Sequence, residues 1–157
     1  MKNADRKRSL LFAGALLVLV GLLSGVAIPA TTTARRGLSA HLAGVQGGML
    51  AMIVGLAWNH LHLSPRLAAT AFGTTIFSNY ALYAALQLAA VWGTSRSTPI
   101  AGEGASGSSM QESAVDLLLY AGSAAAIVAL GLVVWGLVAG AGPSGVLALA
   151  PRLRCPS

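Results

Sequence analysis

The chain has 157 residues, of which 55% are hydrophobic and only 9% are charged. Soluble domains carry about 25% charged residues, so this composition excludes a water-soluble globule and requires much of the surface to face lipid. The formal net charge of +6 does not indicate nucleic-acid binding, because the ten basic residues are scattered and form no stripe for a phosphate backbone. With a single cysteine, Cys155, an internal disulfide and a cysteine-based metal cluster are also excluded.

Four apolar segments follow one another along the chain. The first, at residues 10–30, contains no charged residue and is long enough to cross a hydrocarbon core of about 30 Å. A secretory signal peptide is the alternative for this segment, because a basic start precedes it. We expect the other three transmembrane helices at about 40–61, 67–92 and 115–138. They predict an all-α fold, an integral membrane four-helix bundle that forms one domain over residues 1–157.

The connecting segments set the expected orientation. Residues 94–112 are rich in Gly, Ser, Thr and Pro, which predicts a flexible exposed loop, and the residues after Pro143 are expected to form a short tail. With four spans both ends lie on one side of the membrane, and seven of the ten basic residues fall on that side. Basic residues favour the cytoplasm. We therefore predict a multi-pass protein of the inner (cytoplasmic) membrane with both termini cytoplasmic.

Glycines four residues apart predict close helix packing. The hydrophobic effect does not drive helices together in lipid, so van der Waals contacts at small residues, where backbones approach closely, have to contribute much of the attraction. Four helices with this many small faces have more docking surface than one chain uses, and we therefore expect a homo-oligomer. The glycine pairs are Gly21 and Gly25, Gly44 and Gly48, and Gly136 and Gly140.

A polar stripe on the third segment marks a candidate site. Asn79, Tyr83 and Gln87 follow at intervals of four residues and so share one helix face. Because a polar side chain in hydrocarbon is costly unless it has a partner, these residues are functional candidates. Hydrogen bonds between helices are the alternative for Asn79 and Gln87. Polar residues that we expect to face the stripe are Gln46 on the second segment and Asp116, Tyr120 and Ser123 on the fourth. For Asp116, the helix dipole is the alternative explanation.

His41 is the most informative histidine. It lies where the second segment enters the membrane, among small residues that leave space beside its ring. A neutral imidazole in apolar surroundings is a good axial ligand for heme iron. A hydrogen bond to a backbone carbonyl or to a lipid headgroup is the alternative. His60 and His62 have the spacing of a metal pair, but no third ligand accompanies them in the sequence.

Three stretches carry a family resemblance: residues 36–49 (RGLSAHLAGVQGGM), 79–83 (NYALY) and 98–102 (TPIAG). They resemble the hydroxylaminobenzene mutases, small integral membrane isomerases that convert an arylhydroxylamine into an aminophenol, and the resemblance covers nearly the whole chain. More distantly, the chain is similar to styrene oxide isomerase, whose members bind heme b through a histidine at this place, form trimers and use ferric iron as a Lewis acid. That family has an asparagine six residues after the histidine, where this chain has Gly47.

The resemblance implies a membrane isomerase that rearranges hydroxylaminobenzene, a small aromatic hydroxylamine, to 2-aminophenol by intramolecular hydroxyl transfer. It implies a homotrimer in which His41 is the metal ligand of heme b, with Gly44 and Gly48 beside the cofactor. The expected catalytic residues are Asn79, Tyr83, Gln46 and Asp116. The first two are expected to orient the substrate, and the last two to serve orientation or proton relay.

Other functions remain open on the sequence: an epoxide isomerase, a small transporter or heme-binding electron carrier, and an assembly factor. A transporter would be expected to have a charged or broken helix at mid-membrane and an internal repeat, and the sequence has neither. A diheme carrier generally needs paired axial ligands, whereas His41 is alone in a helical position. An assembly factor would explain the glycine faces but not the aligned Asn79, Tyr83 and Gln87.

Overall fold

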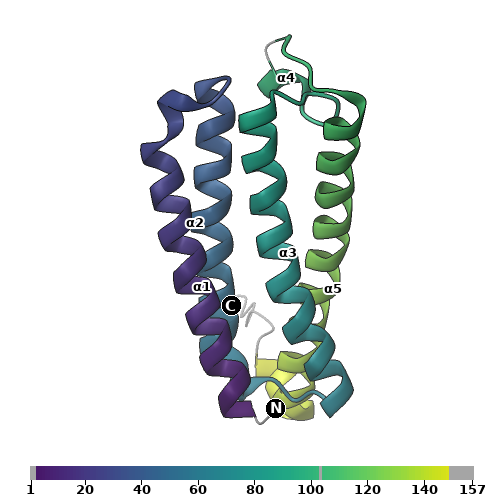
Figure 1. Ribbon diagram of the computed structural model, residues 1–157. Helices are drawn as coiled ribbons and strands as arrows, with labels where there is room; N and C mark the ends of the chain where they lie inside the picture. Colours follow the sequence, from purple (N-terminus) through teal and green to yellow (C-terminus); the bar gives the residue numbers. More distant parts are fainter. Residues whose placement is uncertain (1–2, 103, 149–157) are drawn as a thin grey trace, which may run out of the picture.

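The computed structural model describes residues 3–102 and 104–148, with side chains described up to residue 140 apart from residue 102. These residues are helical and contain no strand, as the sequence predicts. Four long helices run alongside one another, and a short helix lies at one end (Figure 1). The elements are α1 (Asn3–Val26), η1 (Ile28–Ala30), α2 (Ala34–Ala57), η2 (Trp58–His60), α3 (Pro65–Trp92), α4 (Pro99–Gly102) and α5 (Ser109–Ala148).

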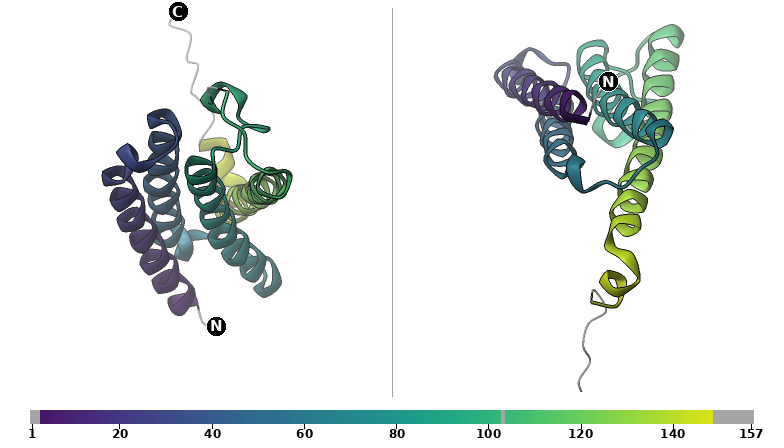
Figure 2. Two further views of the ribbon diagram at one scale, coloured as in Figure 1. Left: turned by 45° about the horizontal axis from the view of Figure 1, so that its top comes forward. Right: turned by 90° about the horizontal axis from the view of Figure 1, so that it is seen from below.

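The long helices form two pairs. Figure 2 shows α1 lying along α2 and α3 lying along α5, and these are the two most extensive contacts between elements. The pairs meet mainly where α3 packs on α2, whereas the contact between α1 and α3 is small. Helix α3 therefore occupies the position between α2 and α5.

Several helices begin before the predicted residue, because their caps lie outside the apolar runs. Helix α2 starts at Ala34 rather than at residue 40, where the Thr33 side chain accepts a hydrogen bond from the Arg36 backbone N–H. Helix α5 starts at Ser109 rather than at residue 115. There the Ser108 backbone N–H donates to Gln111 Oε1 over 2.8 Å and the Gln111 N–H donates to Ser108 Oγ over 3.4 Å, a reciprocal capping box.

The structure differs in part from the predicted exposed loop over residues 94–112. It contains α4 and the first turn of α5, and Thr94 and Glu112 within it are buried. The predicted tail also begins later than expected, because α5 continues across Pro143 to Ala148. Proline costs a helix one backbone hydrogen bond but does not always end it. Arg152, Arg154 and Cys155 lie outside the described residues.

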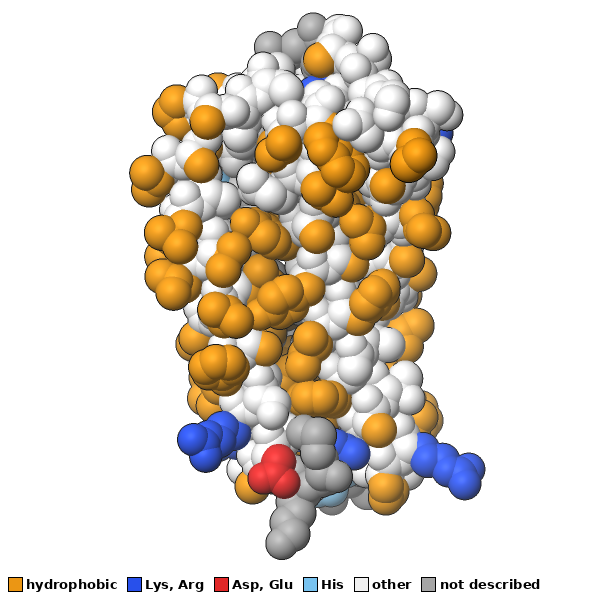
Figure 3. Space-filling view, viewed as in Figure 1, with side chains coloured by type: hydrophobic (Ala, Val, Ile, Leu, Met, Phe, Trp, Pro, Cys, Tyr) orange, Lys and Arg blue, Asp and Glu red, His pale blue; other side chains and the backbone are white. Residues whose placement is uncertain are grey.

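Three of the described helices are long and apolar enough to cross a membrane: α1, α2 with the following turn, and α5 up to Gly140. Apolar side chains cover much of the face seen in Figure 3, as expected for a surface in contact with lipid. Together these features indicate a membrane protein. Helix α3, predicted as a further span, is not among the three.

The first half of helix α3 is rich in hydroxyl groups. Each of these hydroxyls donates to a backbone carbonyl three or four residues earlier in the same helix, so α3 satisfies its own polar groups. The bonds run from Thr70 to Arg66, from Thr74 to Thr70, from Thr75 to Ala71 and from Ser78 to Thr75. Because these groups need no water, α3 can pack between apolar neighbours.

Helices α1 and α2 touch through their backbones. A Cβ atom on Gly48 would lie 2.6 Å from the Gly14 carbonyl oxygen, and one on Gly21 would lie 2.8 Å from the Gly44 carbonyl carbon. No side chain larger than hydrogen fits at these crossings without moving the helices apart. The predicted close packing of Gly21, Gly44 and Gly48 is therefore confirmed within one chain.

The larger apolar side chains gather at the opposite end from α4. Trp58 packs edge-on against Phe72, with ring centroids 6.3 Å apart and an interplanar angle of 81°. Their buried neighbours are Leu10, Val54, Ala68, Ala71 and Val133. This cluster fixes one end of the helices and leaves the glycine-rich middle to be held by backbone contact.

We expect Gly48→Ala to lower the melting temperature in detergent by several degrees, because the added methyl group would meet the Gly14 carbonyl oxygen. Overpacking of this kind costs about 1–3 kcal/mol. Gly131→Ala is the matched control, since a Cβ atom there meets no atom within 4 Å. Unfolding can be followed by tryptophan fluorescence, and equal melting temperatures for Gly48→Ala and the wild type would contradict the backbone contact.

Candidate functional site

A groove between α2 and α3 contains two of the predicted site residues. Gln46 from α2 and Asn79 from α3 both line it, and its volume is about 300 Å³. The other lining residues are Ala43, Gly47, Leu50, Leu82 and Leu86. The groove is thus an apolar channel with two amide side chains, a composition that suits a small aromatic ligand with a polar substituent.

Asn79 is held in a fixed orientation within this groove. Its side chain is buried, and Nδ2 donates to the Thr75 carbonyl oxygen over 2.8 Å. Its Oδ1 atom lies against Gly47, where a Cβ atom would come within 3.0 Å of it. The hydrogen bond to Thr75 is within α3, so Asn79 does not link two helices, which was the alternative explanation for it. Gln46 is exposed at the open side of the groove.

His41 lies on the side of α2 that faces α1. Its Nδ1 atom is 2.8 Å from the Gly21 carbonyl oxygen, and its ring covers Gly25. Because a carbonyl only accepts, Nδ1 carries the proton in this hydrogen bond and the lone pair of a neutral ring is on Nε2. The backbone hydrogen bond that we considered as an alternative to metal ligation is therefore present, and it uses only one of the two ring nitrogens.

Tyr83 and the two glycines of the predicted cofactor site lie on this same side. The Tyr83 ring packs on Gly44, since a Cβ atom there would be 2.9 Å from Tyr83 Cδ2. Gly44 and Gly48 are in contact with the backbone of α1, so the structure gives them a packing role. Their predicted contact with a cofactor stays a prediction. His41 and Tyr83 flank the crossing of Gly21 with Gly44.

The predicted site residues therefore fall into two groups on different sides of α2. At about 100° per residue, His41 and Gln46 point about 140° apart around the helix axis. Gln46 and Asn79 share the groove, whereas His41 and Tyr83 lie towards α1. One chain does not bring all four side chains to a single point.

Asp116 lies apart from both groups, at the end where α4 lies. It accepts a hydrogen bond from the Ser97 hydroxyl, and its Oδ2 atom is 3.3 Å from Arg96 Nη1. Asp116 is two turns into α5, so it does not cap that helix. The polar face that we expected opposite the α3 stripe is also absent there, because Tyr120 is 70% exposed and Ser123 is exposed as well.

Glu112 is the acidic residue that the sequence analysis missed. It is buried in the first turn of α5, and its carboxylate accepts backbone hydrogen bonds from Ser95, Arg96 and Gly107 at 2.9–3.2 Å. These three amides come from the segment on either side of α4. Glu112 therefore ties that segment to α5, and the glutamate after the Ser108 cap was the available signal.

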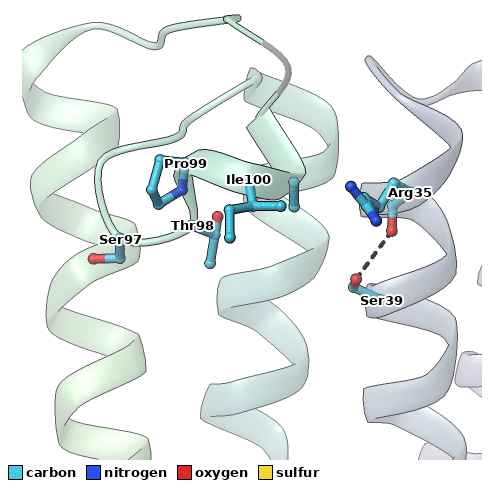
Figure 4. Close-up of a pocket in the computed structure, with 7 residues that line it drawn as sticks. Arg35, Ser39, Ser97, Thr98, Pro99 and Ile100 are labelled. Atoms are coloured by element: carbon cyan, nitrogen blue, oxygen red, sulfur yellow. Dashed lines mark hydrogen bonds between the residues drawn. The ribbon is translucent and has the colours of Figure 1, made fainter.

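A wide depression lies between α4 with the residues before it and the beginning of α2 (Figure 4). Its volume is about 400 Å³, and Arg35 and Ser39 line one side while Thr98 and Ile100 line the other. His60 and His62 lie at the far end of the molecule and are both exposed. The described residues contain no group of three or more His, Cys, Asp or Glu side chains that could hold a metal ion.

Comparison with known proteins identifies the family. The profile described as styrene oxide isomerase matches residues 6–138, which is most of the chain. The chain belongs to the styrene oxide isomerase family. It is also 38% identical over 136 residues to hydroxylaminobenzene mutase HabB of Ectopseudomonas oleovorans, which covers 86% of this chain and 83% of that protein. No solved structure matches the chain.

A second relative gives the same indication. The chain is 36% identical over 112 residues to hydroxylaminobenzene mutase HabA of the same organism, covering 70% of this chain and 83% of that protein. Mutases are isomerases, as are the enzymes after which the family is named. The chain is accordingly an isomerase, and the predicted resemblance to both groups is confirmed.

We expect Glu112→Gln to loosen the segment around α4. The glutamine NH₂ group would replace one carboxylate oxygen that now accepts backbone hydrogen bonds, and it cannot accept them. Leaving buried donors unpaired costs about 1–3 kcal/mol. Hydrogen exchange should be faster at the amides of Ser95, Arg96 and Gly107. Ser109→Ala, in the same turn, is the control. Unchanged exchange at all three amides in Glu112→Gln would show that the carboxylate does not hold them.

Proposed function

We propose that the protein rearranges hydroxylaminobenzene to 2-aminophenol by intramolecular hydroxyl transfer. The observation that carries this proposal is the 38% identity, over 86% of the chain, to a protein named for that substrate. The reaction breaks the N–O bond and forms a C–O bond at the ortho carbon, while a proton leaves that carbon and nitrogen gains one. Substrate and product have the same atoms, so no net oxidant, reductant or second substrate is required.

The groove between α2 and α3 is our proposed substrate site. Its apolar walls would hold the aromatic ring and keep out water, which would otherwise trap the electron-deficient ring as a different product. Asn79 Nδ2 is already bound to Thr75, so Oδ1 is the atom that would accept a hydrogen bond from the substrate nitrogen. Gln46, on the opposite wall, would orient the oxygen that moves.

The surroundings of His41 fit a heme ligand. A ligating histidine usually donates its second ring N–H to a carbonyl or carboxylate, and His41 does so to Gly21. We propose that His41 holds heme b through Nε2. When bound, ferric heme would supply a Lewis acid for the hydroxylamine oxygen. The hydrogen bond to Gly21 would keep the ring in one tautomer and one orientation.

The separation of His41 from the groove supports an oligomeric site. Both can contribute to one reaction only if His41 of one copy meets the groove of another, because they face different sides of α2. We therefore propose a homo-oligomer, a trimer by resemblance, with its sites between copies. Tyr83, on the His41 side, would then orient the substrate from the copy that binds the heme. Asp116 would have no part in the chemistry.

We further propose that the protein lies in the inner (cytoplasmic) membrane with both termini cytoplasmic. Lys and Arg side chains gather at the end of the molecule where α1 begins, as Figure 3 shows for one face. Excess basic residues mark the cytoplasmic side of a membrane protein. The groove lies between the two ends of the long helices, at membrane depth, where a poorly soluble aromatic substrate would concentrate.

The family profile favours one second candidate, an epoxide isomerase. Such an enzyme would also need an apolar pocket and an acid for one oxygen atom, so the groove does not separate the two. Purified protein should therefore be given phenylhydroxylamine and styrene oxide in parallel, with chromatography for 2-aminophenol and phenylacetaldehyde. Turnover of the epoxide alone would reverse our assignment of substrate.

We expect Asn79→Ala and Gln46→Leu to lower kcat/KM for phenylhydroxylamine by about tenfold to a hundredfold, because each removes one hydrogen bond to the substrate. Tyr83→Phe keeps the ring on Gly44 and removes only the hydroxyl. Its control is Tyr120→Phe, since Tyr120 is 70% exposed and lies outside both groups. Wild-type rates in Asn79→Ala, Gln46→Leu and Tyr83→Phe would refute this choice of site residues.

We expect purified wild-type protein to show a Soret absorption band that His41→Ala abolishes. His60→Ala is the control, because it removes an exposed histidine at the far end of the molecule. The band reports heme independently of activity. A colourless but fully active wild-type protein would remove the heme from the proposal and leave the isomerase activity standing.

A further inference from the structure

Buried polar atoms without a partner gather at the end of the molecule near α4. Arg36 is only 2% exposed, and its Nε and Nη2 atoms have no hydrogen-bond partner. The other such atoms among the described side chains are Gln87 Oε1 and Thr94 Oγ1, on the last turns of α3 and just beyond it. All of them lie where α2 begins and α3 ends.

Hydrogen bonds hold the Arg36 guanidinium in this place. Its Nη1 donates to Thr32 Oγ1 over 3.3 Å, and the Thr32 hydroxyl donates to the Ala90 carbonyl oxygen over 2.9 Å. A Cβ atom on Gly93 would lie 3.5 Å from Nη1, so the guanidinium also lies beside the end of α3. The Nη1 atom of Arg36 is therefore held in place, whereas Nε and Nη2 have N–H groups without an acceptor.

A buried guanidinium needs a counter-charge. Taking a charge out of water is costly unless it is paired, and arginine stays protonated at any ordinary pH. Arg36 makes no ion pair in the described part of the chain, where Asp116 pairs with Arg96 and Glu112 is bound to backbone amides. Nε and Nη2 form the edge of the guanidinium that suits one halide or two carboxylate oxygens.

A small cavity lies beside Arg36. It holds about 30 Å³, which is close to the volume of one water molecule. Its lining residues are Arg36, Ser39, Leu86, Ala89, Thr98 and Ala101. The Ser39 hydroxyl donates to the Arg35 carbonyl oxygen over 2.9 Å, so the walls provide the Thr98 hydroxyl as a donor beside the cation and apolar side chains elsewhere. A space this small favours a halide or a formate-sized group over phosphate, sulfate or a sugar acid.

The cavity lies next to the wide depression beneath α4. Ser39, Thr98 and Ala101 line both this cavity and the wide depression beneath α4. Arg35 faces that depression, as Figure 4 shows, so a second positive charge stands at the entrance. Two guanidinium groups in series would attract anions towards the buried one.

We propose that Arg36 forms a buried binding site for a small monovalent anion, of the size of chloride or formate, beneath α4. The anion takes Nε and Nη2 of Arg36 together with the Thr98 hydroxyl, and it neutralises a cation that the fold otherwise buries alone. This site is distinct from the groove of Gln46 and Asn79, and the proposal does not depend on the reaction assigned to that groove.

The test is a titration of purified wild-type protein in detergent, at constant ionic strength, in which sodium gluconate is replaced by sodium chloride or sodium formate. Gluconate is too large for the cavity. We expect a saturable rise in melting temperature of about 3 °C, because an anion that binds only the folded state stabilises it. A wild-type protein that responds equally to gluconate and to the small anions would overturn the proposal without any variant.

Variants locate the site. Arg36→Gln should lose the saturable rise and Arg36→Lys should weaken it, since lysine keeps the charge without the paired donors. Arg66→Gln is the matched control and should keep it, because Arg66 is exposed at the start of α3, the opposite end of that helix from Arg36. An equal rise in Arg36→Gln and the wild type would refute the site.

Discussion

The backbone contact between α1 and α2 is the constraint on which the rest of the structure depends. Gly14, Gly21, Gly44 and Gly48 bring the two helices close enough for a carbonyl of α1 to reach an imidazole of α2. The same crossing leaves room for the Tyr83 ring on Gly44. A methyl group at the crossing would change the packing, the tautomer of His41 and the position of Tyr83 together, because all three share one interface.

Helix α3 places polar side chains among apolar helices. Its threonine and serine hydroxyls bind its own backbone, and Asn79 does the same with one half of its amide. The other half of that amide faces the groove. A helix that satisfies its own polar atoms can carry an amide to membrane depth without a partner on another helix, and this frees the amide for a ligand.

The sequence predicted the helical class, the membrane character and the small-residue contacts, because these follow from composition and from spacing within one helix. It did not predict which side of α2 faces which neighbour, and so it grouped His41 with Asn79. That depends on the rotation of α2 between α1 and α3, which only contacts between distant residues determine. The burial of Arg36 and Glu112 was missed for a related reason: both lie against the segment that contains α4, whose composition is typical of a loop.

Helix α1 contributes no side chain to the groove or to the cavity beneath α4, yet two other helices bind its main chain. The Tyr80 hydroxyl of α3 donates to the Ala13 carbonyl oxygen over 2.8 Å, and His41 of α2 binds the Gly21 carbonyl oxygen over the same distance. These two carbonyls are about 12 Å apart along the helix at about 1.5 Å per residue. Two main-chain carbonyl oxygens of α1 thus fix the positions of α2 and α3 along its axis. Its lipid-facing side chains are free to vary, while a slip of one residue along its axis would misalign both of its neighbours.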